Sequence, residues 1–534
     1  MSFLLLLALA ITLVLATNAA IDDTRTTCSI PSGDEQDSGP NNATRNATDM
    51  PSAPTEPQQP QQHEFDHGQA IINWVRSKGG FVSEKVHVRR RNISDVTSPY
   101  GMFATQDLVE DEIVMKIPRH LYLGLRDEEV VGTDLYDRED VPLHVVMDAY
   151  YANTCRLAHT LLQHWEAYNY TRHPANPSAP SSHLNHATKK TSAESWESPP
   201  HDDPAYYGPY LDYLETQPMG AIPAVYTPIA KQVLRDLLYI GTEMSLHPSC
   251  RKGNTNNHHN NSYSLPPFQL VDWMDEHFIK TGCILDSNNN EEQSLLEQHA
   301  VALVIQRGFD SELIPLWDMV NHDNRQLNLQ TNALRDSPEG LVVWADFAIP
   351  AGNELFATYN YCTDCFDVGD DWGTSGIYRD FGFVEGYPHL WPIWEEHQVD
   401  FKIKLLEKDG VPSKPVAVFF HPPTTNDDSD SSDDDDDNTH NNMDRPLLVP
   451  DECGLAFMRE QWERLSNFDV LDHIQQLEAT LTYQDKIRPH ELDMIGQYRQ
   501  AIVVAFEAAI DATLEHRKRQ QEQPNAETGV HEEL

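Results

Sequence analysis

Basic residues are scarce in this chain of 534 residues. Lysine and arginine together number 38, against 84 aspartates and glutamates, so the formal net charge is -46 at pH 7. A protein that binds nucleic acid needs a basic surface to neutralise phosphates. The composition therefore argues against a nucleic-acid partner. It mildly favours basic, lysine-rich protein partners, through an electrostatic field that salt screens.

Hydrophobic residues are also few, at 39% of the chain, and the mean hydropathy is -0.55. These values predict disordered segments beside two or three hydrophobic cores. Residues 21–65 are rich in Ser, Thr, Asn, Gln, Pro and Asp, and we expect a disordered linker there. The like charges of Asp427–Asp437 repel one another, so residues 421–445 are expected to form a disordered acidic tether.

Long apolar runs are lacking after the first 20 residues, so no later segment is predicted to span a membrane. Residues 3–15 are almost entirely apolar, and Thr17–Ala20 supplies small residues for cleavage. This pattern predicts a signal peptide in residues 1–20, with an uncleaved anchor as the alternative. We therefore expect the protein to be located in the secretory pathway, or in an organelle reached through it. Asn-x-Ser/Thr sequons compatible with that route begin at Asn42, Asn46, Asn92, Asn169 and Asn260.

Cysteines are too sparse for a disulfide scaffold. They are Cys28, Cys155, Cys250, Cys283, Cys362, Cys365 and Cys453. Cys362–Cys365 is a lone CxxC that suits a redox pair, half a zinc site or a local disulfide. Because no second CxxC exists, we interpret it as uncoordinated or simply paired. His258 and His259 lie in an Asn-rich stretch that is typical of a loop, so no metal site is predicted.

Apolar periodicity predicts the secondary structure of the remaining chain. Residues 66–125 suggest a helix followed by short strands, with one strand from Val109 to Ile117 that Pro118 ends. Residues 141–310 favour helices, most clearly His144–Tyr168 and Glu292–Gly308. Strand-like runs return over residues 311–385, notably Gly340–Ala345.

A C-terminal helical unit is expected over residues 446–520. One face of His490–Leu514 carries apolar side chains at helical spacing. They are Leu492, Ile495, Tyr498, Ile502, Val503, Phe506 and Ile510. The residues from Arg517 onward are polar, and we expect them to fray.

The most informative segment is Leu313–Asp323, where an apolar run ends abruptly in Asn321-His322. Taken alone, this pattern is typical of a buried element that finishes in a turn. Other motifs accompany it in a fixed order. They are Ile71–Gly80, Tyr100–Thr105, Glu112–Pro118, Leu121–Leu123, Gly208–Leu214, Gln306–Phe309, Ala351–Tyr359 and Phe381–Val384.

This series resembles the SET-domain protein methyltransferases of the Rubisco large-subunit methyltransferase-like family, over roughly residues 66–400. The resemblance implies an α+β fold, with a SET-domain β-fold, a helical insertion at about 141–310 and a small all-α C-terminal unit. It also implies the cofactor S-adenosylmethionine (SAM) and a protein substrate that is methylated at lysine.

The resemblance further implies roles for individual residues. Tyr359 is the expected catalytic tyrosine. Phe381 and Phe383 are expected to line the substrate channel. The expected cofactor-binding residues are Gly101, Met102, Phe103, Arg307, Asn321 and His322. A glycine permits close backbone approach, and an arginine can form a forked pair with the SAM carboxylate.

The chain departs from the family pattern at several positions. Gln306 replaces a serine, Asn360 replaces a glycine, and Phe381 replaces a tyrosine and so removes a hydroxyl from the channel. Such a loss can alter the number of methyl groups added or the acceptor, because some relatives modify histidine. The alternatives to lysine methylation are therefore histidine methylation, a catalytically weak or inactive peptide-binding module, and a secreted acidic interaction protein.

Overall fold

The computed structural model describes most of the chain from Asp66 to Glu522. The described residues are 66–92, 98–125, 129–132, 143–172, 203, 205–218, 222–241, 263–265, 270–284, 291–309, 312–332, 340–359, 373–393, 399–408, 411–420, 449–480 and 486–522. The predicted signal peptide, linker and acidic tether lie outside these ranges. So do the CxxC and the histidine pair at 258–259. None of the helices within the described ranges combines the length and apolar character that a membrane span requires.

The described chain has a mixed α+β fold. One sheet has the order β1-β4-β12-β11, formed by Phe81–Val82, Ile113–Ile117, Leu341–Ala345 and Leu329–Thr331. A second has the order β10-β13-β3-β2, formed by Asn321–His322, Glu354–Ala357, Tyr100–Ala104 and Val86–Arg90. A small third sheet joins β5 (Leu123–Gly124), β9 (Glu312–Leu313) and β8 (Gly308–Phe309). The short helices η2 (Arg119–Leu121) and η7 (Trp317–Met319) connect these strands.

Local sequence explains where the N-terminal elements begin and end. Helix α2 (His67–Ser77) begins after Asp66, whose carboxylate accepts a hydrogen bond from the Gln69 amide. The predicted strand at 109–117 is wrong in its first half, because Asp111 adopts a left-handed turn conformation with φ of 62°. Strand β4 therefore begins only at Ile113, and Val109 is 61% exposed.

The helices of the predicted insertion are α3 (Leu143–Arg172), α4 (Gly208–Glu215), α5 (Pro228–Leu238) and α6 (Glu291–Arg307). Short elements accompany them, namely η4 (Pro223–Val225), β6 (Tyr239–Gly241), β7 (Tyr263–Ser264) and the π-helical η6 (Asp275–Ile279). The predicted helices at 144–168 and 292–308 are thus confirmed by α3 and α6. Helices α3, α4 and α6 share one hydrophobic core with the first three sheets, whereas α5 belongs to a second core.

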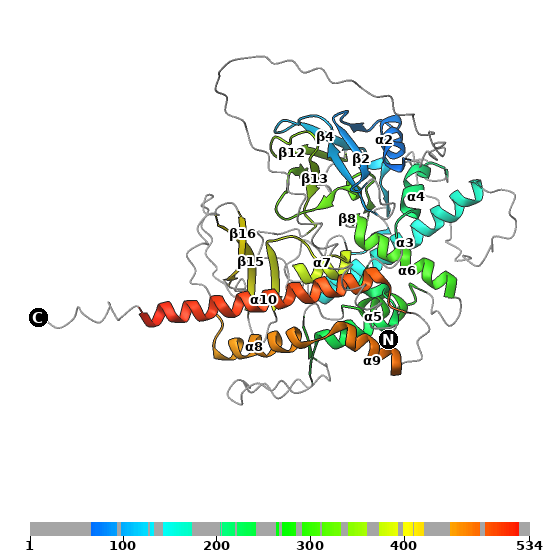
Figure 1. Cartoon of the computed structure of the whole chain (residues 1–534). Helices are drawn as coiled ribbons and strands as arrows, with labels where there is room; N and C mark the ends of the chain where they lie inside the picture. The colour runs from blue at the N-terminus through cyan, green and yellow to red at the C-terminus, as the bar shows by residue number, and fades with distance from the viewer. Residues whose placement is uncertain are drawn as a thin grey trace, which may run out of the picture. The chain divides into compact units, whose positions relative to one another are not determined.

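The second core is built largely from the C-terminal half of the chain. It includes residues of α7 (Thr374–Phe381), α8 (Glu452–Asn467), α9 (Val470–Thr480) and α10 (Pro489–Glu522). A three-stranded antiparallel sheet, β14 (His389–Ile393), β15 (Val399–Lys408) and β16 (Val411–Phe420), packs against α10 (Figure 1). No pattern noted above predicts this sheet, and β15 crosses residue 400, the expected end of the SET region.

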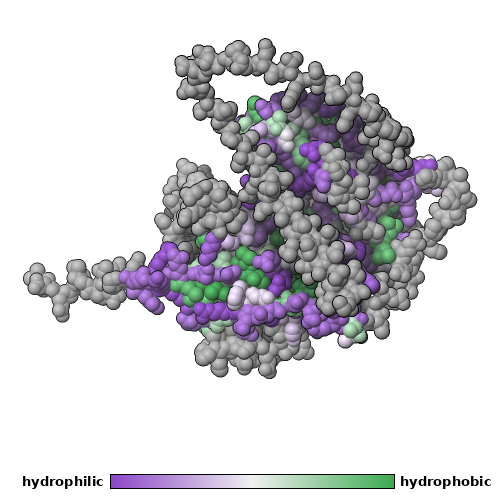
Figure 2. Space-filling view, viewed as in Figure 1, coloured by the Kyte–Doolittle hydropathy of each residue, from purple (hydrophilic) through white to green (hydrophobic). Residues whose placement is uncertain are grey.

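Helix α10 confirms the predicted apolar face, since Ile495, Tyr498, Ile502 and Phe506 are buried. Figure 2 shows hydrophobic residues gathered between α8 and α10, with hydrophilic residues toward the C-terminal end of α10. The prediction that the chain frays from Arg517 is wrong. The helix continues to Glu522, because the Arg517 guanidinium bonds the Pro450 carbonyl and the Glu452 carboxylate.

A buried carboxylate ties α10 to the helical insertion. The Glu491 side chain accepts hydrogen bonds from the backbone amide and hydroxyl of Thr227, just before α5, and from Arg488. Burial opposes ionisation, but these donors outweigh it and lower the pKa of Glu491. This pairing helps explain why α5 packs with the C-terminal helices.

Candidate active site

The Asn321-His322 pair forms β10, which runs parallel to β13. Asn321 lies opposite Phe356 and His322 opposite Ala357. On its other side β13 pairs with β3, which carries Gly101. Because Tyr359 follows the end of β13 by two residues, the sheet brings three segments that are distant in sequence to one place.

The Asn321 side chain holds this junction together. Its Nδ2 donates to the Tyr100 carbonyl at 2.9 Å and to Glu354 Oε1 at 2.7 Å. The other oxygen of Glu354 accepts from Arg91 at 2.9 Å. A Cβ at Gly101 would lie 2.3 Å from Glu354 Oε1 and 2.8 Å from Asn321 Nδ2. Glycine at 101 is therefore needed for this contact.

We expect Gly101→Ala to displace the Glu354 carboxylate and weaken the Asn321 contact. Overpacking of this kind costs about 1–3 kcal/mol of the free energy of unfolding, which urea denaturation measures. Gly496→Ala is the matched control, since a Cβ at Gly496 would have no atom within 4 Å and a helical alanine stabilises by about 0.5–1 kcal/mol relative to glycine. Equal effects of the two variants would contradict the assigned role of Gly101.

The His322 side chain is completely buried and both of its ring nitrogens are engaged. Its Nδ1 accepts a hydrogen bond from the Tyr359 backbone amide at 3.0 Å. Its Nε2 must therefore carry a proton, which it donates to Glu385 Oε2 at 2.8 Å. Glu385 also accepts from Asn324 Nδ2 at 2.6 Å and from the Thr374 hydroxyl at 2.7 Å. The carboxylate thus joins the Asn-His segment to α7.

The Tyr359 hydroxyl points at a fixed acceptor. It donates to the Val320 carbonyl at 2.7 Å, so its oxygen keeps lone pairs for another donor. The ring centroid lies 4.6 Å from that of Phe381, 5.4 Å from that of His322 and 6.4 Å from that of Phe383. Burial raises the pKa of Tyr359 to about 12, so the hydroxyl is neutral near pH 7.

The half-buried Arg307 and the buried Asp318 form a polar cluster near Tyr359. Arg307 Nη1 donates to the Tyr213 hydroxyl at 2.7 Å and to the Asp318 carbonyl at 2.8 Å, and Nη2 donates to Gln217. Within the described residues, Arg307 Nε and Asp318 Oδ1 are buried without a hydrogen-bond partner. A forked pair between Arg307 and a SAM carboxylate would therefore require Gln217 to move.

Asp318 should make stability depend on pH. Burial raises its pKa from 3.8 to about 6, although Arg307 and Tyr210 act in the opposite direction. Since the folded state holds the proton more tightly, this stabilising contribution is present below pH 3.8 and is lost as the pH rises to about 6.

We therefore expect the stability of Asp318→Asn, relative to wild type, to rise between pH 4 and 7 by up to about 3 kcal/mol. Urea denaturation at each pH measures the difference. Asp346→Asn, at an exposed position, serves as the control. A difference independent of pH would show that the pKa of Asp318 is not raised.

The remaining predicted site residues lie in the protein interior. Met102 is fully buried in the first core, and the Phe103 ring lies 3.6 Å from the Arg89 guanidinium. Their side chains contact protein, so a cofactor role for them stays a prediction that concerns their backbone. Sequence reasoning did not single out Asp318 or Glu385. Both stand within or next to recognised motifs, at Leu313–Asp323 and after Phe381–Val384.

Comparison with known proteins gives structural neighbours only. No protein-family model matches the chain, and no curated protein matches it. The chain is similar over 88% of its length to the SET domain of LSMT bound to lysine and AdoHcy, covering 96% of that chain at 10% identity and a TM-score of 0.36. It is likewise similar over 88% to Rubisco LSMT bound to AdoMet, covering 97% of that chain at 11% identity and a TM-score of 0.39.

Proposed function

We propose that this protein transfers a methyl group from SAM to the side-chain amine of a lysine in a protein substrate. The observation that carries the proposal is Tyr359, whose hydroxyl is anchored to the Val320 carbonyl and whose ring packs against the rings of His322 and Phe381. The ordered motif series supports the same reaction.

The chain's own groups suit the acceptor amine. Because the Tyr359 proton is committed to Val320, the phenol oxygen can accept an amine N–H and orient the nitrogen lone pair. The rings of Phe381 and Phe383 lie beside the Tyr359 ring, where they would keep water from a bound amine, and desolvation would favour the neutral, nucleophilic amine. When bound, SAM supplies an electrophilic methyl group on a sulfonium. An N–C bond to the lysine amine would form as the C–S bond of SAM breaks, and one proton of the lysine ammonium group would leave to solvent.

The cofactor is assigned to backbone groups around β10 and β3. The amide protons of Asn321 and both ring nitrogens of His322 are occupied by protein partners, so these side chains fix the backbone instead of reaching a ligand. Gly101 leaves its strand without a side chain at the junction. The backbone here and the unpaired Arg307 Nε are the groups that would hold SAM.

Calorimetry with SAM on the full chain tests the cofactor assignment. Wild type should bind, and Asn321→Ala should weaken binding at least about tenfold, because the backbone of β10 loses its tie to Tyr100 and Glu354. Asn332→Ala is the matched control, since it also loses a pair of hydrogen bonds, to Gly340 and Val342 in the first sheet. No binding by wild type would overturn the proposal.

A peptide array with radiolabelled SAM tests the acceptor. Each peptide is presented with lysine, histidine or arginine at one position. Labelling of lysine peptides alone supports the proposal. Labelling of histidine peptides would instead identify a histidine methyltransferase, and SAM binding without labelling of any peptide or extract protein would favour a binding module. The acidic net charge of the chain leads us to expect that basic peptides label best.

We also propose that the protein follows the secretory route. In support, Cys155 and Cys283 form a disulfide and Cys453 is disulfide-bonded, and such bonds persist in oxidising compartments. A C-terminally tagged chain should sediment with secretory membranes or appear in the medium. Recovery from the cytosol with the first 20 residues intact would contradict this.

A further inference from the structure

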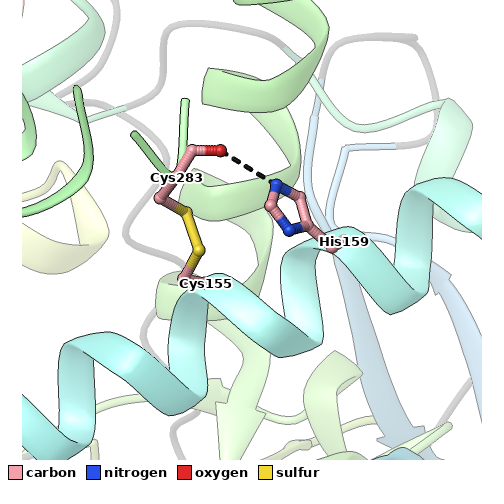
Figure 3. A group of neighbouring side chains, drawn as sticks. All are labelled: Cys155, His159 and Cys283. Carbon is pink, nitrogen blue, oxygen red and sulfur yellow. Dashed lines mark hydrogen bonds between the residues drawn. A yellow bond between two sulfur atoms is a disulfide. The ribbon is translucent and has the colours of Figure 1, made fainter. Parts of the chain in front are cut away.

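Cys155, His159 and Cys283 form a compact cluster in the helical insertion (Figure 3). Cys155 and His159 are four residues apart on α3 and therefore share one helix face. Cys283 follows η6 and is bonded to Cys155 in a disulfide that spans 128 residues of sequence. One ligand atom from each of the three residues lies within 4.8 Å of the others.

The hydrogen bond of His159 determines which ring nitrogen is available. Its Nε2 lies 2.9 Å from the Cys283 carbonyl, which can only accept, so Nε2 carries the proton. In the neutral ring the lone pair is then on Nδ1. Metal-binding histidines typically show this arrangement, with one ring N–H donated to a backbone carbonyl and the other nitrogen on the metal.

The cluster is also accessible. Cys155 and His159 are half-buried, and only Cys283 is buried. A reductant and a hydrated metal ion would therefore approach the cluster from the side of Cys155 and His159. Two thiolates and one imidazole are ligands that Zn²⁺ prefers, and water can complete a tetrahedral set.

We propose that the cluster has a second state, in which the reduced Cys155 and Cys283 bind Zn²⁺ together with His159. Two electrons from a thiol or phosphine reductant break the S–S bond and give two thiols, and the reductant becomes a disulfide or a phosphine oxide. Zinc then displaces the two thiol protons to solvent.

The proposal means that the contact between α3 and the segment 270–284 is cross-linked under both oxidising and reducing conditions. The disulfide joins α3 to the segment 270–284, where Tyr151 also stacks on His277 with ring centroids 4.0 Å apart. Zinc would maintain that junction where a reducing compartment opens the disulfide. The inference concerns structure and metal binding, and it stands independently of methyl transfer.

The test uses Co²⁺ as a spectroscopic probe of Zn²⁺ on the full chain, with Cys362→Ser and Cys365→Ser introduced to remove the CxxC. After anaerobic reduction with a phosphine, the protein should show thiolate-to-cobalt absorption that stoichiometric Zn²⁺ abolishes. The oxidised protein should not show it. Cys155→Ser should abolish the absorption, and His159→Gln should weaken Zn²⁺ affinity about 100-fold or more, since even outer-shell changes cost 10–100-fold.

His159→Gln is the informative variant, because its amide can still donate to the Cys283 carbonyl and the disulfide can still form. Circular dichroism of the oxidised variant verifies its fold before reduction. The proposal is overturned if the reduced protein binds no metal. It is equally overturned if Cys155→Ser and His159→Gln leave the cobalt absorption and the zinc affinity unchanged, because the metal would then lie on other cysteines.

Discussion

Replacing Tyr359 by phenylalanine should leave SAM affinity unchanged and slow methyl transfer by about 100-fold or more. The tyrosine ring packs against Phe381 and His322, and phenylalanine keeps those contacts. The substitution removes only the phenol oxygen. Without that oxygen, no acceptor anchored to the Val320 carbonyl remains to orient the incoming amine. The loss should therefore appear in kcat more than in the binding of either substrate.

Single-turnover methylation of a lysine peptide measures the rate of methyl transfer, and calorimetry on the same variant measures the SAM affinity. Tyr498→Phe is the matched control. Tyr498 is fully buried and its hydroxyl donates to the Ser375 hydroxyl, but it belongs to the second core. A Tyr359→Phe variant that turns over within a few-fold of wild type would remove Tyr359 from the reaction.

Replacing Glu385 by alanine should lower the free energy of unfolding by roughly 3–5 kcal/mol, because three buried hydrogen-bond donors would lose their acceptor. His322, Asn324 and Thr374 all donate to that carboxylate. His322 cannot adapt by moving its proton to Nδ1, since that atom accepts from the Tyr359 amide. The segment that carries Tyr359 would lose its support, and SAM binding should weaken with it.

Glu385→Gln discriminates between loss of hydrogen bonds and loss of volume. Its carbonyl oxygen can still accept from His322 and Asn324, while its amide donates to the Thr374 hydroxyl. We expect it to cost only about 1–2 kcal/mol, one charge-assisted hydrogen bond. Urea denaturation compares the two variants. If Glu385→Ala and Glu385→Gln unfold at the same urea concentration, the carboxylate does not hold the Asn-His segment.

Several elements could be predicted from local sequence alone. Helices α3, α6 and α10 follow from apolar residues at helical spacing, and the end of β4 follows from Pro118. The start of β4 could not be predicted in the same way. Three acidic residues, Glu110 to Glu112, separate Val109 from Ile113, and the left-handed backbone at Asp111 makes this stretch a turn instead of the first half of a strand.

The candidate site was likewise predictable only in part. The order of the motifs identified Tyr359, Asn321, His322 and Gly101 as candidate site residues, and their cofactor and catalytic roles stay predictions. The reason for glycine at 101 is visible only in three dimensions, where Glu354 and Asn321 fill the space of a side chain. Arg307 was expected to hold a carboxylate, yet its terminal nitrogens bond Tyr213, Asp318 and Gln217.

The sequence by itself determined the mixed α+β character, the acidic charge and the local elements, because periodicity and turn residues act over a few neighbouring positions. Tertiary structure alone decided which buried faces meet. It joined His322 to Glu385 across 63 residues, paired Cys155 with Cys283 across 128, and placed α5 in the C-terminal core. An apolar or ionisable pattern specifies that a side chain needs a partner, but only the folded backbone specifies which partner it receives.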